Sequence, residues 1–340
     1  MGLVTADPVR EAEAAPAPPA RAGADEARRL WTGMISVAAA GLLLGALVLA
    51  VPGLHDVLAR IEGVDPGWIA LAIGLELVSC AGFVLAFRRV FARLPARLAT
   101  RVALTELAFT AVVPAGGAGG IAAGAWIANV KGAPVKRFLE RSGVLFLLTS
   151  AVNAGTLALA GLLVAAGVLG APGRLLGLVP GVIGVLVIGG FALLPALARR
   201  LRGEGKRARA LRTTARIVTA TRAELRLPSL GLAGAVAYLW ADVAMLWICF
   251  RAFGETLPIG AVTLAFLIGY LANVVPVPGG IGALDGGLVA ALVAYGAHPA
   301  SAAAAVLLYH AIVFWIPALI GTTAFLRLRS TLGEPVAAAS

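Results

Sequence analysis

The feature that most limits the fold of this chain is a series of long apolar segments. They cover residues 32–52, 68–87, 102–130, 142–168, 175–198, 229–250, 259–295 and 302–326. A helix of about 20 apolar residues crosses the hydrocarbon core of a bilayer, which is roughly 30 Å thick. Only 13% of the residues are charged, whereas about a quarter are charged in a soluble domain. The sequence therefore predicts an all-α polytopic membrane protein.

Proline and glycine interrupt two of these segments. The interrupting residues are Pro114, Gly116, Gly117, Gly119 and Gly120 in the third segment, and Pro276, Pro278, Gly279, Gly280 and Gly282 in the seventh. Proline removes a backbone donor and glycine has a large conformational entropy, so neither stretch propagates a helix. At about 1.5 Å per residue, the shorter flanking pieces do not span the hydrocarbon. We expect 102–130 and 259–295 to be re-entrant hairpins.

The basic residues indicate on which side of the membrane each loop lies. Five arginines occur in 88–101, before the first hairpin, and four Lys or Arg residues occur in 131–141, after it. Cytoplasmic loops are enriched in Lys and Arg, and a hairpin leaves both groups in the cytoplasm. With the second hairpin treated likewise, 25 of the 28 Lys and Arg residues are cytoplasmic. This predicts six full spans, two hairpins that enter from opposite faces, and cytoplasmic N and C termini.

The composition of the remaining regions indicates which of them are tails, loops or surface helices. Residues 1–29 are rich in Ala, Pro and charge, which predicts a disordered cytoplasmic tail. Residues 30–328 form a single membrane domain, and 329–340 form a second cytoplasmic tail. The loop 199–226 contains ten basic and two acidic residues. We expect it to determine topology at the anionic leaflet, with a lipid-headgroup or regulatory site as the alternative. Residues 54–66 have apolar side chains at helical spacing, which indicates a short amphipathic helix on the outer surface.

The order span, hairpin, span occurs twice. The first set is 68–87, 102–130 and 142–168, and the second is 229–250, 259–295 and 302–326, in the opposite orientation. Inverted repeats with interrupted helices are the design of many transporters, whose substrates bind near the midplane. Each break is followed by a Gly-x-x-x-Gly pair, Gly120/Gly124 and Gly282/Gly286. We expect each pair to allow close helix packing.

Few polar side chains lie within the apolar segments. Ionisable groups at membrane depth are costly and tend to mark function. The residues that we expect to line a substrate path are Glu76, Glu106, Asn153, Asp242, Asp285, Tyr309 and His310, with Tyr270 and Asn273 as uncharged companions. Glu76 and Asp242 occupy equivalent spans, each near its middle. The structural alternative is that each carboxyl group is only hydrogen-bonded among helices.

The backbone at the breaks is a second candidate binding feature, because exposed amide donors suit a phosphate group. The carboxyl groups and His310 would tune charge or carry coupling protons. Cys80 and Cys249 lie inside apolar runs with no CxxC or His/Cys spacing, so we interpret them as packing residues. We expect no metal and no cofactor. The sequence shows no nucleophile–base pair, so we do not expect an enzyme.

Several stretches resemble one membrane family. They are PVPGGIGALDGGL at 276–288, LLYH at 307–310, FWIP at 314–317, PAGGAGG at 114–120 and FLLTSAVN at 146–153. Together they resemble the lysylphosphatidylglycerol synthase transmembrane family, also called flippase-like, over residues 32–328. In this family the membrane half of the full-length proteins moves aminoacylated phosphatidylglycerol to the outer leaflet. The resemblance implies that the chain translocates a lipid or a lipid-linked headgroup.

The chain departs from the family pattern in three respects. The acid after the second glycine motif is commonly Glu and is Asp285 here, and the position after Tyr309 is often Arg and is His310 here. The chain also stops after the last span, without the soluble aminoacyl-transferase domain. We therefore expect a stand-alone member that does not synthesise lipid.

The leading hypothesis is a lipid flippase in the plasma membrane. Its expected partners are membrane lipids, anionic or aminoacylated, with a separately encoded synthase as a further candidate. We expect no nucleic-acid partner, because the position of the basic residues explains the net charge of +11. One alternative is a secondary transporter of a soluble solute. Another is a membrane scaffold for a separate lipid-modifying enzyme.

Overall fold

A computed structural model describes residues 63–112, 118–170, 173–200, 205–226, 229–271 and 283–330, all within one compact unit of the chain. Every regular element in these ranges is a helix. Three expected features lie outside them: the tail 1–29, the first span 32–52 and nearly all of the surface helix 54–66. Most of the C-terminal tail 329–340 lies outside them as well.

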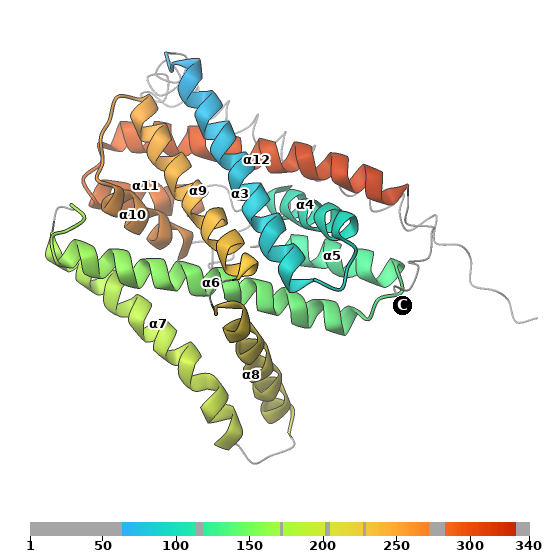
Figure 1. Ribbon diagram of the computed structural model, residues 1–340. Coiled ribbons are helices and arrows are strands. Elements are labelled where there is room, and N and C mark those ends of the chain that lie inside the picture. The colour runs from blue at the N-terminus through green and yellow to red at the C-terminus, as the bar shows by residue number, and fades with distance from the viewer. Residues whose placement is uncertain are drawn as a thin grey trace, which may run out of the picture. The chain divides into compact units, whose positions relative to one another are not determined.

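The helices in the described ranges are labelled in Figure 1. They are α3 (Pro66–Val90), α4 (Ala96–Val112), α5 (Ala118–Val130), α6 (Val135–Ala165), α7 (Arg174–Arg200), α8 (Lys206–Glu224), α9 (Leu230–Ala252), α10 (Ile259–Leu271), α11 (Ala283–Ala294) and α12 (Pro299–Arg329). Five of them are long and apolar enough to cross a membrane: α3, α6, α7 over Arg174–Ala196, α9 and α12. They correspond to the expected full spans that follow the first.

Local sequence explains where several helices begin. The Asp65 carboxylate accepts a hydrogen bond of 2.7 Å from the Gly67 amide at the start of α3, and Pro66 occupies the first helical position. The Ser229 hydroxyl caps α9 in the same way. Pro299 begins α12. Proline suits the first position because its missing N–H would have no partner within the helix, and side-chain oxygens satisfy the other exposed amides.

Glycine brings α3 and α9 into direct backbone contact. An added Cβ at Gly82 would lie 2.7 Å from the amide nitrogen of Tyr238, and one at Gly234 would lie 2.6 Å from that of Ala86. Gly82 lies in the second half of α3, whereas Gly234 lies near the start of α9, so the two helices run antiparallel. Equivalent spans of an inverted repeat have opposite orientations, which is the relation that these two helices show.

Two pairs of short helices correspond to the expected hairpins. In the first, α5 packs on α4, and a Cβ at Gly120 would lie 2.5 Å from the carbonyl oxygen of Glu106. In the second, α11 packs on α10, and a Cβ at Gly269 would lie 2.8 Å from the Cα of Leu288. The expectation for Gly286 is wrong, since an added Cβ there meets no atom within 4 Å among the described residues. In this pair, Gly269 of α10 is a small residue at the described contact.

The outer ends of the two pairs lie at opposite ends of the bundle (Figure 1). The turns before α4 and after α5 line one cavity together with α8. Around the second pair, the Ser301 hydroxyl in α12 donates to Glu255, which precedes α10, at 2.8 Å. The helix α9 connects the two ends. Its start packs on Arg89 beside the first pair, and near its end the Trp247 indole donates to the carbonyl of Leu257 at 3.1 Å.

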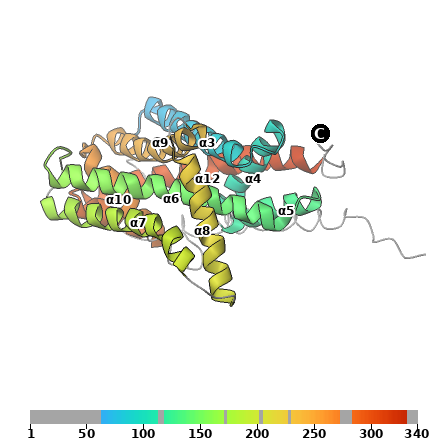
Figure 2. The same cartoon turned by 60° about the horizontal axis from the view of Figure 1, so that its bottom comes forward.

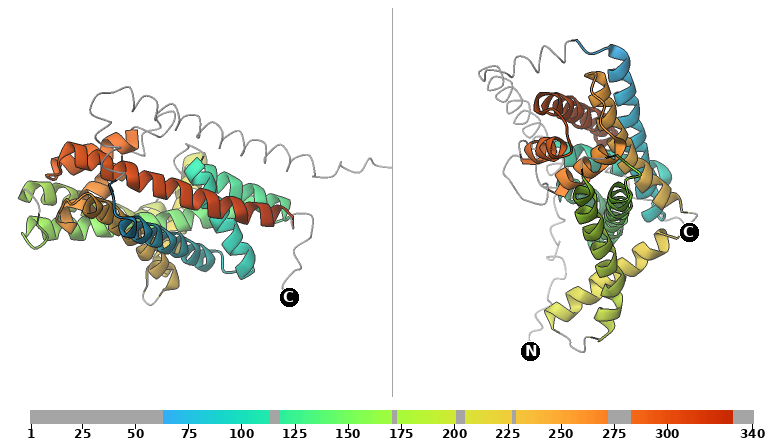
Figure 3. Two further views of the ribbon diagram at one scale, coloured as in Figure 1. Left: turned by 90° about the horizontal axis from the view of Figure 1, so that it is seen from above. Right: turned by 90° about the vertical axis from the view of Figure 1, so that its left-hand side faces the viewer.

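The contacts between helices follow an approximate two-fold pattern. The first pair packs on α12 through α4, and the second packs on α6 through α10. In addition, α5 packs on α6 while α11 packs on α12. Seen from above, α12 runs past both pairs (Figure 3, left). The same contacts result when each helix of the first repeat is replaced by its counterpart in the second. The counterparts are α3 and α9, α4 and α10, α5 and α11, and α6 and α12. The inverted order of the sequence elements predicts this relation.

The basic stretch expected as a loop contains the helix α8 (Figure 2). Ala and Arg make up ten of the 19 residues of 206–224, and both have high helix propensity. Ala215, Val218 and Thr221 are buried, and α8 packs on α6 and α7. A charged segment therefore becomes helical because one narrow face of small and apolar side chains is covered by the bundle.

The helix α7 presents one face to α6 and another to the exterior. A Cβ at Gly177 would lie 2.6 Å from the amide nitrogen of Ala165, and one at Gly161 would lie 2.5 Å from that of Gly181. On the other face, Leu186 is 67% exposed and Leu193 is 69% exposed. Small residues at a helix contact and large apolar residues outside it are typical of a helix that faces lipid.

Candidate functional site

Two carboxyl groups meet where α3 and α9 pack together. Glu76 lies near the middle of α3 and Asp242 near the middle of α9. Their side chains are close enough to interact electrostatically. Glu76 is only 3% exposed, whereas Asp242 is partly exposed. The structure thus brings together the two acids that occupy equivalent positions in the inverted repeat.

Neighbouring side chains partly satisfy this pair. The Cys80 thiol donates to Oε1 of Glu76 at 3.4 Å, while Oε2 of Glu76 has no hydrogen-bond partner within the described ranges. The Ser79 hydroxyl lies near the Asp242 carboxyl group and donates to the carbonyl of Tyr238 at 3.4 Å. A buried oxygen without a partner is costly, so Glu76 retains the capacity to bind a donor.

Three tyrosines surround the acids, and their phenol groups all interact electrostatically with Asp242. They are Tyr238 in α9, Tyr270 in α10 and Tyr309 in α12. Tyr309 is 7% exposed and Tyr270 is 46% exposed. We call Glu76, Asp242 and these tyrosines the carboxyl–tyrosine cluster. It draws on four helices of both repeats and reaches the exterior on the α10 side.

The cluster offers a specific chemistry. Carboxyl groups accept hydrogen bonds and attract cations, and phenols donate hydrogen bonds and present an aromatic face. The apolar ring of Phe266 lies beside two of the tyrosines. Its centroid is 6.1 Å from that of Tyr309 and 6.2 Å from that of Tyr270. No group of three His, Cys, Asp or Glu side chains in the described ranges is placed to hold a metal ion. The arrangement suits a polar or cationic headgroup, or protons.

Glu106 is separate from this cluster. It lies in α4 and is 4% exposed, and its Oε1 has no hydrogen-bond partner within the described part of the chain. An added Cβ at Gly124 would collide with this oxygen. Glu106 is therefore packed between the helices of the first pair, and the Gly120/Gly124 motif makes room for it.

The remaining predicted residues are more scattered. His310 is partly exposed on α12 beside Tyr309, with the ring centroids 6.5 Å apart. Asn153 is partly exposed on α6 and makes no side-chain hydrogen bond within the described ranges. Asp285 lies in the first turn of α11, but its side chain is outside the described part of the structure. These residues are not shown to join the carboxyl–tyrosine cluster.

Most residues of the two breaks lie outside the described ranges. The structure describes Gly119 and Gly120, which lie in the first turn of α5. The others are Pro114, Gly116, Gly117, Pro276, Pro278, Gly279, Gly280 and Gly282. Backbone binding of a headgroup at the breaks therefore remains a prediction from the sequence.

Sequence reasoning missed Ser79 and Tyr238. Ser79 follows Glu76 by three residues, and Tyr238 precedes Asp242 by four. Residues three or four apart share one face of a helix. A search for polar residues three or four positions along the sequence from each mid-span acid would have found Ser79 and Tyr238.

Comparison with protein families identifies the family of this region. Residues 37–321 match the family model described as the lysylphosphatidylglycerol synthase TM region. The match includes every residue of the carboxyl–tyrosine cluster and both helix pairs. A search of curated proteins finds no match to the chain.

Proposed function

This chain belongs to the lysylphosphatidylglycerol synthase transmembrane family, and we propose on that premise that it moves a lipid between leaflets of the plasma membrane. The family is a membrane domain linked to lipid metabolism, and the apolar helices make this chain an integral membrane protein. The proposed cargo is a phospholipid or a lipid-linked headgroup. No covalent chemistry is part of the proposed activity.

The observation that carries the proposal is the carboxyl pair between α3 and α9. These helices are the equivalent spans of the two repeats, and Glu76 and Asp242 lie at their middle. Polar groups at membrane depth are costly and are retained mainly where they serve transport. Substrate sites of transporters built from inverted repeats lie near the midplane at the interface of the repeats. The position of the carboxyl–tyrosine cluster between the two repeats, near the middle of α3 and α9, supports this assignment.

The proposed topology has six full spans, two re-entrant hairpins and cytoplasmic termini. The pairs α4–α5 and α10–α11 are the hairpins, and their outer ends lie at opposite ends of the bundle. Each hairpin then reaches toward the midplane from one face. Irregular backbone is tolerated at membrane depth only where protein or a wet cavity covers it. The two breaks are the proposed walls of a polar groove.

In the proposed mechanism only the headgroup enters the protein. The acyl chains stay in the bilayer, beside exposed apolar side chains such as Leu186 and Leu193. The headgroup is exchanged between the backbone donors of the breaks and the carboxyl–tyrosine cluster. Rocking of one repeat against the other then opens the groove alternately to each leaflet.

Leaflet exchange in proteoliposomes made from the host's own lipids tests the proposal. A membrane-impermeant reagent reports how much lipid reaches the outer leaflet, and a trapped dye reports solute leak. We expect lipid movement without leak, and we expect it to be abolished by Asp285→Asn. Folding of the variant is checked by its thermal unfolding in detergent.

Two results would point to other functions. Uptake of a soluble solute without lipid movement would favour a secondary transporter. No movement of either, in folded protein that co-purifies with a lipid-modifying enzyme, would favour a scaffold. Normal lipid exchange by Asp285→Asn would remove that residue from the proposed mechanism.

A further inference from the structure

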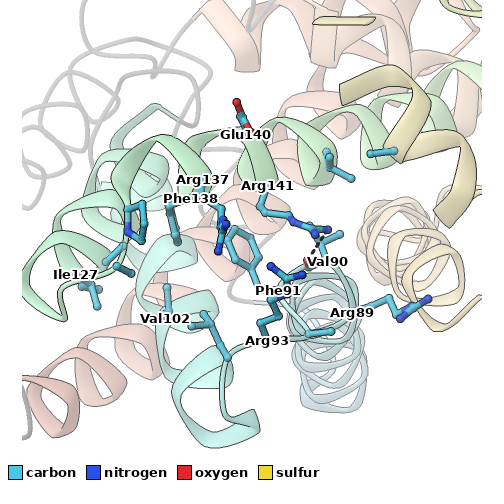
Figure 4. A pocket seen from close by; sticks show the side chains of 18 of the residues that line it. Arg89, Val90, Phe91, Arg93, Val102, Ile127, Arg137, Phe138, Glu140 and Arg141 are labelled. Atoms are coloured by element: carbon cyan, nitrogen blue, oxygen red, sulfur yellow. Dashed lines mark hydrogen bonds between the residues drawn. The ribbon is translucent and has the colours of Figure 1, made fainter. Parts of the chain in front are cut away.

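One end of the bundle holds a cavity of about 650 Å³ (Figure 4). Its wall is formed by the turn before α4, the turn after α5, the first part of α6 and one side of α8. These segments belong to the basic stretches 88–101, 131–141 and 199–226. The fold therefore gathers basic residues that are far apart in the sequence around one space.

The cavity wall carries an excess of positive charge. Glu224 is one of two acids in it and is paired with Arg89 at 3.2 Å. The other acid, Glu140, is paired with Arg216 at 3.6 Å. The basic side chains of the wall are Arg89, Arg93, Lys131, Arg137, Arg141 and Arg216. After the two acids are paired, the wall still attracts an anion.

Three exposed arginines face the space beside Phe91 (Figure 4). Arg137 and Arg141 extend from α6, and Arg93 extends from the turn between α3 and α4. Arg141 donates to the carbonyl of Val90 at 3.4 Å. The side chains of Arg93 and Arg137 make no hydrogen bond or ion pair within the described ranges. Guanidinium groups with free donors match the geometry of a phosphate group.

The interior of the cavity is apolar. The rings of Phe91 and Phe138 lie with centroids 4.9 Å apart, and Val102 and Ile127 are buried beside them. Gly124 lines the inner end, where an added Cβ would lie 2.5 Å from Cζ of Phe138. A small soluble anion would leave this surface bare, whereas an acyl chain would cover it and gain from its burial.

We propose that this cavity binds a lipid that bears a phosphate group. The phosphate lies against the guanidinium groups of Arg93, Arg137 and Arg141, and the first part of an acyl chain lies against Phe91 and Phe138. The cavity shares no residue with the carboxyl–tyrosine cluster, so it is a second site. The inference deepens the proposed function, on which it rests for the role of the cavity as the cytoplasmic loading site.

Native mass spectrometry of the full chain in detergent measures this binding. Phosphatidylglycerol is titrated against wild type and against the double variant Arg93→Gln/Arg137→Gln. We expect the double variant to bind phosphatidylglycerol at least about tenfold more weakly, because two charge-assisted contacts are lost. Wild type should also prefer phosphatidylglycerol to phosphatidylcholine, whose choline group offsets the phosphate charge.

The matched control is Arg212→Gln/Arg222→Gln. It removes the same charge from exposed positions of α8 that do not line the cavity. We expect its affinity for phosphatidylglycerol to stay within about twofold of wild type. Equal losses in the two double variants, with unchanged thermal unfolding, would show general attraction to basic protein and would overturn the inference.

Ala220→Trp and inorganic phosphate separate a lipid from a free anion. Ala220 lines the cavity from α8 and is exposed, so a tryptophan there narrows the space without changing its charge. We expect Ala220→Trp to lose binding of phosphatidylglycerol. We expect millimolar inorganic phosphate not to displace the lipid from wild type. Displacement by phosphate, together with normal binding by Ala220→Trp, would identify a soluble phosphate site and contradict the lipid assignment.

Binding and leaflet exchange are scored separately. Charge-dependent lipid binding without leaflet exchange would uphold the cavity and contradict the proposed function. Leaflet exchange without charge-dependent binding would uphold the function and contradict the cavity as a lipid site.

Discussion

Glu76 and Asp242 are the residues on which the proposed mechanism depends most. Their helices pack so closely that glycine is required at the contact, and neither acid has a basic partner within the described ranges. One oxygen of Glu76 lacks any hydrogen bond within the described residues. A protein selected only for stability would gain by replacing such a pair with apolar side chains. The pair is therefore best explained by a ligand, a proton or a headgroup that it serves.

Asp242→Asn should reduce lipid exchange by at least about tenfold, which corresponds to one lost charged interaction. The amide has the same shape but lacks the negative charge that the cluster offers to a cationic group or a proton. Asp65→Asn is the matched control, since it removes one exposed carboxylate and Asn is an equally good N-cap. Leaflet exchange in proteoliposomes measures both. Equal rates for Asp242→Asn and wild type would exclude the cluster from the transport path.

The sequence was sufficient to predict the two acids, Tyr309 and Tyr270, but not Tyr238. A mid-span acid stands out because its burial is costly. Tyr238 lies in an apolar segment where an aromatic residue is ordinary. Its relevance depends on which helix faces meet, and only the packing of α3, α9, α10 and α12 reveals that. The opposite holds for Asn153, which is polar in the sequence yet makes no side-chain hydrogen bond within the described ranges.

At the level of helices, the contact between α3 and α9 holds the two repeats together. Gly82 and Gly234 place backbone against backbone, with no space for a side chain at either position. In lipid, close packing replaces the hydrophobic effect as the force between helices. The distance between the two acids therefore depends on these glycines.

Gly82→Ala should destabilise the protein by about 1–3 kcal/mol, the usual cost of overpacking. The added Cβ would lie 2.7 Å from the Tyr238 amide nitrogen, which is backbone and does not turn aside. Gly74 lies in the same helix, where an added Cβ meets nothing within 4 Å among the described residues. Gly74→Ala should therefore be neutral or slightly stabilising. Thermal unfolding in detergent measures the stability of both variants. Equal shifts of the unfolding temperature in the two variants would contradict the close contact between α3 and α9.

The proposed hairpins can be tested with single cysteines at exposed positions. Arg97 and Lys136 flank the first pair, and Thr256 and His298 flank the second. In intact cells, a membrane-impermeant maleimide should label cysteines at 256 and 298. It should label cysteines at 97 and 136 only after permeabilisation, because the proposed topology places both ends of the first pair in the cytoplasm.

The background for this labelling replaces the two native cysteines, Cys80 and Cys249, which are buried. A full span in place of α4–α5 would put positions 97 and 136 on opposite sides of the membrane. Labelling of only one of them in intact cells would therefore contradict the re-entrant topology.

Prediction at the level of helices succeeded where the signal was strong. Long apolar runs predicted α3, α6, α7, α9 and α12, because length and composition alone distinguish such helices. The breaks predicted two pairs of short helices. The helix α8 was missed because a dense run of basic residues dominates its composition and hides its narrow buried face. The expectation for Gly286 is wrong because a Gly-x-x-x-Gly spacing does not specify which partner helix lies opposite.

At the level of the whole molecule, the two candidate sites lie in different parts of the bundle. The carboxyl–tyrosine cluster lies where equivalent helices of the repeats meet. The basic cavity lies at one end of the bundle, between the outer ends of the first pair and α8. In the proposed mechanism, a lipid that binds its phosphate at this end later presents its headgroup to the cluster. In the proposed topology, this is movement from the cytoplasmic leaflet toward the midplane.

The most direct test of the proposed function is the rate at which purified protein moves native lipids between leaflets. Proteoliposomes are made from the host's own lipids, and lipids newly exposed on the outside are labelled and identified by mass. We predict that one class of phosphate-bearing lipid becomes exposed faster than in protein-free vesicles, and that Asp242→Asn slows this exposure while Asp65→Asn does not. Equal exposure of every lipid class with and without folded protein would contradict lipid translocation.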